Sequence, residues 1–215
     1  MAKKKQYTEG ELITLFHLKR ITGNQTSKMK EWFSFEPAQL DVFEQNIFDG
    51  ALARATESIA GWSEEDLKMK FISHILPLGH LTDNSRFVTY YEKKLTGEVD
   101  GISLSVKSDF MIAKGVLNFY SNPYFHFHEY KPQVNPTGEP MAQLIEAMLL
   151  AQEKNQNGKP IYGAEIIGRN WSFVIMQDRE YCISRAFDSI QKNDLLDIIA
   201  ILRKFRYILE TELLD

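Results

Sequence analysis

The pattern of apolar and polar positions along the chain predicts helices that alternate with strands. In SEEDLKMKFISHILPLG, residues 63–79, apolar side chains recur at helical spacing. Ser63 is the expected N-cap, Asp66 stands three residues on as its capping partner, and the proline and glycine of PLG end the helix. Two more amphipathic helices are predicted, over residues 139–154 and 193–214.

Residues 7–60 predict helices that carry no candidate chemistry. TEGELITLFHLKRI has helical periodicity with Thr8 as its N-cap. EPAQLDVFEQNIFDGALARATESIAGW predicts one or two helices, with a break near Asp49-Gly50. We therefore expect residues 1–61 to form a helical segment that packs on a core formed by residues 62–215.

Segments with strand patterning lie on both sides of the 139–154 helix. They are FVTYYEKKL, GISLSVKSDFMIA and YFHFHEYKP before it, and PIYGAEIIG, WSFVIMQ and YCISRAF after it. The sequence TGEVDG between the first two is expected to be a turn. This order of elements predicts an α/β fold, in which a mixed sheet is flanked by helices and further helices lie at both ends of the chain.

Composition places the chain among ordinary globular proteins. It has 215 residues, of which 44% are hydrophobic and 25% charged. No apolar run approaches the length of a membrane span, and the basic start MAKKKQYTEGEL lacks the apolar segment of a secretory signal. The single cysteine, Cys182, excludes an internal disulfide and fits a reducing compartment. We expect a cytoplasmic protein without a membrane partner. The net charge of −4 argues against a protein that coats nucleic acid through bulk charge, but a local basic groove remains compatible with this net charge.

Charged residues interrupt two of the predicted strands. Alternation gives YFHFHEYKP one face that ends in a charged pair and another of histidine and tyrosine side chains. The first face comprises Phe125, Phe127, Glu129 and Lys131, and the second His126, His128 and Tyr130. Asp109 lies in the hydrophobic run of the preceding strand, where a carboxylate is disfavoured unless a charged partner meets it. If these strands pair, Asp109 and Glu129 repel each other unless a cation lies between them, and Mg²⁺ commonly binds one or two protein carboxylates.

Two helices add candidates. Glu64 projects from the centre of the apolar stripe of the 63–79 helix, and Glu65, near the edge of that stripe, is its substitute. The dipole of a first helical turn favours acids in any case, so Glu64 has a purely structural alternative. Gln143, at the start of the 139–154 helix, is placed to reach a substrate phosphate or a metal-bound water, or to lie at the surface.

In this order the candidate residues resemble the PD-(D/E)XK, or restriction-endonuclease-like, nuclease superfamily. The matching residues are Glu64, Ser108-Asp109, Glu129-x-Lys131 and Gln143. SEEDLKMKFISHIL is also similar to the acidic helix of the N-terminal nuclease region of type I restriction subunits. The resemblance covers about residues 62–185, and Ser108 stands where the pattern has proline, at a position that varies.

The resemblance implies a restriction-endonuclease-like core and an endonuclease that hydrolyses DNA with Mg²⁺, with Mn²⁺ as a second ion and RNA as an alternative substrate. Asp109 and Glu129 would hold one or two ions, with the backbone carbonyl of Tyr130 as a further ligand and Glu64 completing the shell. Lys131 would orient or deprotonate the attacking water, or stabilise charge on the phosphate. Partial burial and a nearby metal would lower the pKa of Lys131.

Other interpretations stay open. A non-catalytic module that binds nucleic acid or protein and retains the nuclease fold is the alternative function, favoured by the acidic net charge and by the lack of a visible DNA-reading element. The long apolar stripe of the last helix predicts that it covers the sheet, with homodimer formation as the alternative. His126 and His128 lack a third ligand nearby, so a zinc site is poorly supported.

Overall fold

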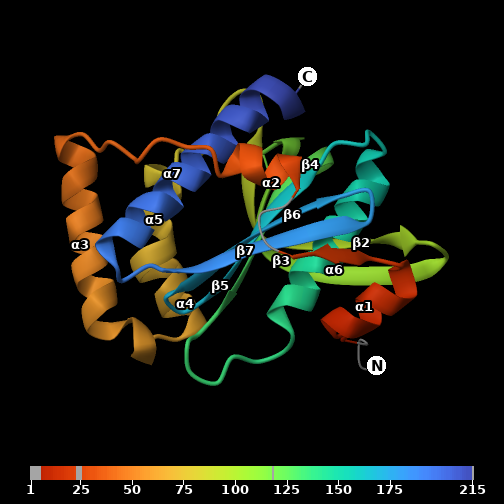
Figure 1. Cartoon of the computed structure of the whole chain (residues 1–215), viewed down its shortest axis with the longest axis horizontal. Coiled ribbons are helices and arrows are strands. Elements are labelled where there is room, and N and C mark those ends of the chain that lie inside the picture. Colours follow the sequence, from red (N-terminus) through yellow and green to blue (C-terminus); the bar gives the residue numbers. More distant parts are fainter. Residues whose placement is uncertain (1–5, 23–25, 118, 215) are drawn as a thin grey trace.

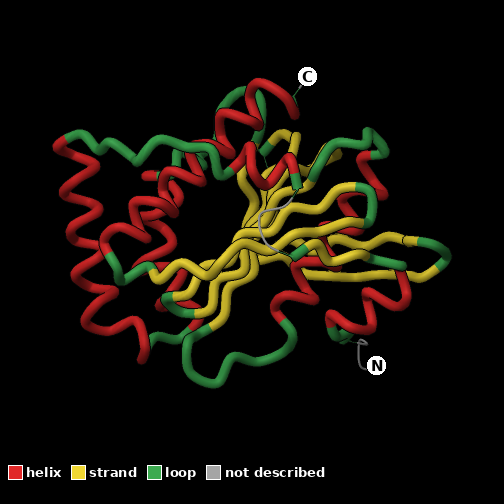
Figure 2. Tube along the Cα trace, viewed as in Figure 1, coloured by secondary structure: helices red, strands yellow, loops and turns green. Residues whose placement is uncertain are grey.

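A seven-stranded mixed sheet flanked by helices forms the protein (Figures 1 and 2). The structure is a computed structural model that describes residues 6–22, 26–117 and 119–214. The basic start of the chain, MAKKK, therefore lies outside the described residues. The expected α/β fold is confirmed at this level. Among the described residues, no helix combines the length and the apolar character that crossing a membrane requires.

Seven α-helices and seven strands are described. The helices are α1 Glu9–Phe16, α2 Ser27–Trp32, α3 Val42–Ser58, α4 Glu64–Leu67, α5 Ser73–Leu78, α6 Pro140–Asn155 and α7 Lys192–Ile208. Shorter turns are η1 Ile59–Gly61, which is 3₁₀, and the π-helical η2 Lys68–Ile72 and η3 Leu209–Leu213. The strands are β1 Lys19–Ile21, β2 Val88–Val99, β3 Ile102–Val116, β4 Phe119–Lys131, β5 Ile161–Ile167, β6 Asn170–Gln177 and β7 Glu180–Asp188.

The sheet has the strand order β1-β7-β6-β5-β4-β3-β2. Two neighbouring pairs, β4 with β5 and β1 with β7, are parallel, and the other four are antiparallel. The parallel pair β4–β5 is joined through α6, because parallel neighbours need a crossover connection. β4 is thus held between β3 and β5, with its charged C-terminal end in the interior of the sheet rather than at an edge.

Each face of the sheet has its own hydrophobic core. The α7-side cluster includes Trp32, Phe71, Trp171 and Phe205, and the helices α2, α3, α5 and α7 contribute to it. The α6-side cluster lies under α6 and α1 and includes Phe127. Figure 1 shows α6 and α7 on opposite sides of the sheet. Fully burying a large apolar side chain stabilises a fold by about 1.5–3 kcal/mol, so both layers fix the position of β4.

The apolar stripe of α7 is used inside the chain. Its buried residues are Leu195, Ile198, Ile199, Ala200, Ile201, Leu202, Phe205 and Ile208. At Gly79, after α5, an added Cβ would lie 2.6 Å from the Cβ of Leu202, so only glycine permits this approach to α7. The helix therefore covers the sheet, and a homodimer through it stays a prediction.

The start of the 63–79 helix follows the sequence. Ser63 Oγ accepts a hydrogen bond from the Asp66 N–H at 3.1 Å, and Asp66 Oδ2 accepts one from the Ser63 N–H at 3.3 Å. This capping box satisfies backbone donors that a helix start leaves free. The predicted helix is present as α4, the π-helical turn η2 and α5, and it ends at Gly79.

Three expectations about the first hundred residues are wrong. The break near Asp49-Gly50 is absent from α3, because one face of that helix is buried through Phe48, Ala51 and Ala55 and holds it continuous. The TGEVDG turn is shorter than expected. Strands β2 and β3 extend to the two-residue turn Asp100-Gly101, whose φ angles of 49° and 76° suit a tight hairpin.

The segment 1–61 is also not wholly helical. β1 has three residues and pairs in parallel with β7, with Arg20 opposite Tyr181. Both core clusters contain residues from this segment and from residues 62–215, including Leu12 in one and Phe48 in the other. The division into two units consequently stays a prediction, while the packing of the segment on the core is observed.

Candidate functional site

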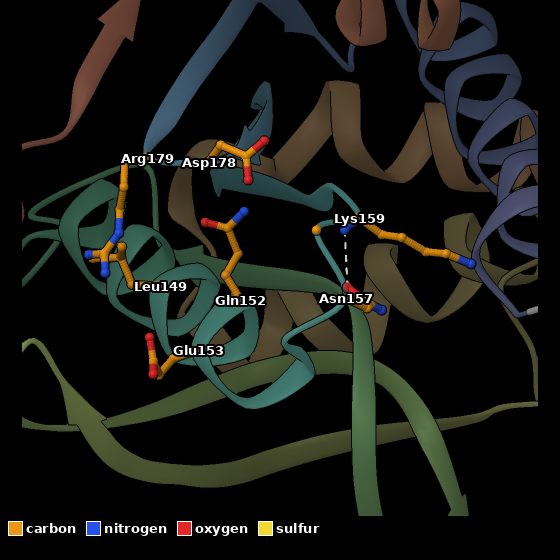
Figure 3. Close-up of a pocket in the computed structure, with 8 residues that line it drawn as sticks. Leu149, Gln152, Glu153, Asn157, Lys159, Asp178 and Arg179 are labelled. Atoms are coloured by element: carbon orange, nitrogen blue, oxygen red, sulfur yellow. Dashed lines mark hydrogen bonds between the residues drawn. The ribbon is translucent and has the colours of Figure 1, made fainter.

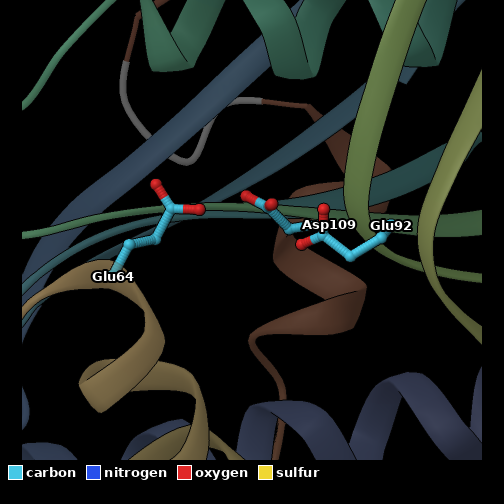
Figure 4. A group of neighbouring side chains, drawn as sticks. All are labelled: Glu64, Glu92 and Asp109. Carbon is cyan, nitrogen blue, oxygen red and sulfur yellow. The ribbon is translucent and has the colours of Figure 1, made fainter.

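Charged side chains from four segments meet where α4 approaches β2, β3 and the C-terminal end of β4. They are Glu64 and Lys68 from the α4–η2 helix, Glu92 from β2, Asp109 from β3, and Glu129 and Lys131 from β4. We call these six residues the acid–lysine cluster. Figure 4 shows Glu64, Glu92 and Asp109 projecting toward one another from α4, β2 and β3. One carboxylate oxygen from each of these three residues lies within 4.8 Å of the other two.

Asp109 is the anchor of the cluster. It is 8% exposed, and its Oδ2 accepts a hydrogen bond from the backbone N–H of Tyr130 at 2.7 Å. Its Oδ1 accepts one from Lys68 Nζ at 2.9 Å. Burial raises the pKa of Asp109, although both hydrogen bonds favour its charged form. The Asp109 carboxylate therefore joins β3 to β4 at the residue that separates Glu129 from Lys131.

The backbone is irregular at this point of the sheet. Leu104 and Met111 both belong to the α6-side cluster, although strict alternation along β3 would put them on opposite faces. Glu92, whose position in the register is opposite Asp109, has a φ of 55°. A non-glycine residue in this region costs of order 1–3 kcal/mol, and such strain concentrates at functional sites. The irregularity therefore lies where Glu92 and Asp109 contact the same ammonium group, that of Lys68.

Lys68 holds three acids at once. Its Nζ donates to Glu64 Oε1 and Glu92 Oε1 at 2.7 Å each, and to Asp109 Oδ1 at 2.9 Å. Burial opposes the charge of this ammonium group, but its three carboxylate partners outweigh burial and raise the pKa of Lys68. Lys68 therefore stays charged and neutralises acids that come from three different segments.

Glu129 and Lys131 form a second, adjoining pair. Lys131 Nζ donates to Glu129 Oε1 at 2.6 Å and to the Tyr130 carbonyl oxygen at 2.9 Å, and it lies 3.5 Å from Glu64 Oε2. Burial and the nearby Asp109 carboxylate raise the pKa of Glu129 to about 8. Burial opposes the charge of Lys131, yet the surrounding carboxylates raise its pKa. The lowered pKa expected for Lys131 beside a bound metal ion stays a prediction.

The sequence candidates separate clearly in space. Glu64, half-buried, faces the cluster, whereas Glu65 is exposed. Gln143 is half-buried at the start of α6, with its Oε1 3.1 Å from where a Cβ on Gly138 would stand, so it turns toward the loop before α6. Among the described residues, Gln143 forms no hydrogen bond with a member of the cluster. The Tyr130 carbonyl, expected as a metal ligand, points to the cluster and accepts from Lys131.

Sequence reasoning missed Lys68 and Glu92. Lys68 follows Glu64 by four residues, a spacing that brings two side chains together on a helix, and this was a usable signal. Glu92 gave only a weak signal, as an acid inside the strand-like YYEKKL. Its exposed neighbour Lys107 forms an ion pair with Glu92 at the rim of the cluster.

The opposite face of β4 carries a neutral network. His126 Nε2 and His128 Nε2 are 2.6 Å apart, and His128 Nδ1 lies 2.9 Å from the Tyr130 hydroxyl. Burial lowers the pKa of both imidazoles, that of His128 to about 3. We call these three side chains the histidine–tyrosine network. The two Nε2 atoms are thus engaged with each other.

One residue of β4 departs from the predicted alternation. Phe125 packs in the α7-side cluster, although it was expected on the face of Phe127. The register with β3 shifts at this point: Ile112 pairs with His126 but Ala113 pairs with Tyr124. This β-bulge places Tyr124, which stacks on Phe127, in the position expected for Phe125.

A small pocket lies elsewhere in the molecule. It has a volume of about 150 Å³ and is bounded by the C-terminal half of α6, the loop after it and the β6–β7 turn. Figure 3 shows Gln152, Asn157 and Arg179 around this space. None of its lining residues belongs to the acid–lysine cluster. The acid–lysine cluster and this pocket are therefore separate features of the molecule.

Comparison with known proteins gives no family for the chain. No protein-family model matches it, and no curated protein is similar to it. The interpretation of the cluster consequently depends on its geometry and on the chemistry of its residues.

Proposed function

We propose that the protein is a Mg²⁺-dependent nuclease that hydrolyses phosphodiester bonds in DNA, built on a restriction-endonuclease-like core. The observation that carries this proposal is the contact between Asp109 and the segment Glu129–Lys131, which are twenty residues apart in sequence. The Glu64 carboxylate lies 3.5 Å from Lys131 Nζ, so the helix acid of the nuclease pattern is adjacent to the residues from the strands. Two paired strands thus supply two acids that can hold a metal ion and a lysine that can contact the phosphate or the water in metal-assisted hydrolysis.

The donor atoms fit a hard divalent cation. Carboxylate oxygens of Glu64, Glu92 and Asp109 lie within 4.8 Å of one another. The backbone carbonyl of Tyr130 accepts from Lys131, whose Nζ lies 3.5 Å from Glu64. Oxygen ligands suit Mg²⁺ and Mn²⁺ rather than zinc or copper. Asp109 and Glu64 would hold the ion together with Glu92, and Glu129 and the Tyr130 carbonyl would be further ligands. When bound, the ion would polarise the phosphate and lower the pKa of a bound water.

Lys131 has a defined part in this reaction. Its ammonium group is fixed by Glu129 and by the Tyr130 carbonyl, at 2.6 and 2.9 Å. These two contacts hold its Nζ in place as a hydrogen-bond donor. It would orient the attacking water and stabilise the negative charge that develops on the phosphate oxygens.

A specific observation favours the second candidate, a non-catalytic binding module with the same fold. Each acid of the cluster already has a lysine nitrogen within 2.9 Å. Such a closed set of ion pairs would also stabilise a fold that no longer binds a metal. The net charge of −4 agrees with this alternative, because it gives no bulk attraction for nucleic acid.

A cleavage assay separates the two candidates. Supercoiled plasmid, linear duplex, single-stranded DNA and RNA are incubated with the wild type, Asp109→Asn and Asp197→Asn, in Mg²⁺, Mn²⁺ or EDTA. Asp197 is the matched control, because its ion pair is with the exposed Arg185 on another part of the surface. We expect metal-dependent cleavage by the wild type and the control, reduced at least 100-fold in Asp109→Asn. Absence of cleavage by the wild type with every substrate and ion would favour the binding module.

A further inference from the structure

Lys68 differs from its neighbour Lys70 in how it is held. Both lysines form an ion pair with an acid four residues earlier, Lys68 with Glu64 at 2.7 Å and Lys70 with Asp66 at 2.6 Å. The Lys70 side chain is 51% exposed, whereas that of Lys68 is 19% exposed. Lys68 alone of the two reaches across to β2 and β3, where it contacts Glu92 and Asp109. An ordinary helical pair would not need these two long-range contacts.

The Lys68 ammonium group uses the oxygens that a metal ion would need. Asp109 has two carboxylate oxygens: Oδ2 accepts from the Tyr130 N–H and Oδ1 accepts from Lys68. Glu64 Oε1 is likewise taken by Lys68. Mg²⁺ binds oxygen at about 2.0–2.1 Å, and two cations cannot share the same oxygens at close range without strong repulsion.

The charges of the site also indicate that Lys68 stands where a cation could bind. The four carboxylates of the site, from Glu64, Glu92, Asp109 and Glu129, face Lys68 and Lys131, with Lys107 at the rim. Removing the Lys68 ammonium group takes one positive charge from the site and leaves the carboxylates of Glu64, Glu92 and Asp109 without their shared partner, which favours binding of a cation.

We propose that Lys68 occupies the place of the metal ion in the metal-free protein, and that the ion binds by displacing the Lys68 side chain. The identity of the site rests on the proposed function, but the displacement concerns binding alone. Lys68 stands at the start of the π-helical turn η2, a type of irregularity that is frequent at functional sites. Its four-carbon stem is flexible, and its partial exposure gives the ammonium group a route to solvent without opening the core.

Two consequences follow for the unmodified protein. Lys68 stabilises the fold when no metal is present, because it neutralises Glu64, Glu92 and Asp109. It also weakens metal binding, because the ion must replace these contacts. A divalent ion therefore binds only when it is abundant enough to compete with an ion pair within the same chain.

Calorimetric titration of Mn²⁺ into metal-free protein tests the displacement. The variants are Lys68→Met, which keeps the side-chain length without the charge, and Lys70→Met as the matched control on the same helix. We expect Lys68→Met to bind Mn²⁺ at least tenfold more tightly than the wild type, and Lys70→Met to bind it as the wild type does. The double variant Lys68→Met/Asp109→Asn should lose the gain, which assigns the gain to this site.

Thermal unfolding gives a second measurement that needs no substrate. Metal-free Lys68→Met should melt below the wild type, and saturating Mn²⁺ should raise its melting temperature by more than it raises that of the wild type. Equal or weaker Mn²⁺ binding by Lys68→Met, or no binding at all, would overturn the inference. Tighter binding by Lys68→Met in a protein that cleaves no nucleic acid would uphold the displacement and reject the nuclease. Cleavage by the wild type, with no gain in Mn²⁺ affinity in Lys68→Met, would uphold the nuclease and reject the displacement.

Discussion

The two faces of β4 carry polar networks that differ in charge, although their residues alternate along one strand. Glu129 and Lys131 join the acid–lysine cluster, whose members Glu64, Lys68 and Glu92 are partly exposed. His126 and His128 are buried on the other face, where burial lowers the pKa of both imidazoles and leaves them neutral. Burial without a counter-charge lowers the pKa of a base such as histidine. The carboxylates in contact with Lys68 and Lys131 instead raise the pKa of both lysines.

The difference assigns separate roles to the two networks. Charged groups with partial access to solvent can bind an ion and act on a substrate. A neutral network that is closed on all sides contributes through its hydrogen bonds and its packing against Trp32 and Phe205. Substitutions in the first network should therefore change chemistry, and substitutions in the second should change stability.

The largest effect is expected at Lys131. Lys131→Met should lower the rate of DNA cleavage 100- to 1,000-fold, or about 3–4 kcal/mol in activation free energy, because the charge that orients the water and stabilises the phosphate is lost. Single-turnover cleavage measures this, with the exposed Lys192→Met as control. If Lys131→Met cleaved at the wild-type rate, Lys131 would belong to the fold alone.

The second effect concerns the neutral face. His128→Ala should lower the free energy of unfolding by about 2–3 kcal/mol, since it leaves a cavity and removes the partner of the Tyr130 hydroxyl and of His126 Nε2. Mn²⁺ affinity should change by less than about threefold. Urea unfolding and calorimetry measure the two quantities, and Lys192→Ala at an exposed position of α7 serves as control. Loss of metal binding in His128→Ala would show that the two faces are coupled.

The third effect separates the faces by pH. The folded-state pKa of His126 lies well below its ordinary value near 6.5, so the unfolded chain binds the proton first on acidification. The stability that neutral His126 contributes is complete above about pH 6.5 and is lost as the pH falls below that value. Between pH 7.5 and 5.5, the wild type should therefore lose about 1 kcal/mol more stability than His126→Phe.

Unfolding in urea at both pH values, in the presence of EDTA, measures this difference. A pH dependence of His126→Phe that equalled the wild type would mean that His126 is not held neutral by the fold.

The smallest effect tests the irregular point of β2. Glycine adopts a φ of 55° without strain, so Glu92→Gly should be more stable than Glu92→Gln by about 0.5–1 kcal/mol, although both lose the contacts with Lys68 and Lys107. At the regular, exposed position Lys94, the order should reverse, with Lys94→Gly less stable than Lys94→Gln. If Glu92→Gln were the more stable of the two variants, the backbone at position 92 would not be strained.

Local patterns were sufficient to predict most elements and four of the six cluster residues, Glu64, Asp109, Glu129 and Lys131. The capping box at Ser63 and the apolar periodicity of α6 are short-range features, so they survive in the folded protein. Alternation along β4 correctly placed Glu129 and Lys131 opposite His128, and an acid in the hydrophobic run of β3 correctly marked Asp109 as a partnered residue.

What the sequence did not predict depends on long-range contacts. The bond between Lys68 and Asp109 spans 41 positions, and no local pattern announces it. β1 has three residues and forms because β7 offers it an edge. The bulge at Phe125 and the positive φ of Glu92 belong to the pairing of strands rather than to either strand alone.

The central claim is that the acid–lysine cluster binds a divalent cation in place of the Lys68 ammonium group. Anomalous diffraction from crystals grown with Mn²⁺, at concentrations used for cleavage, tests it most directly. The account predicts a peak about 2–2.5 Å from an Asp109 carboxylate oxygen, with Lys68 Nζ moved beyond hydrogen-bonding distance of Asp109. A map with no peak at Asp109, and with Lys68 still bonded to all three carboxylates, would contradict it.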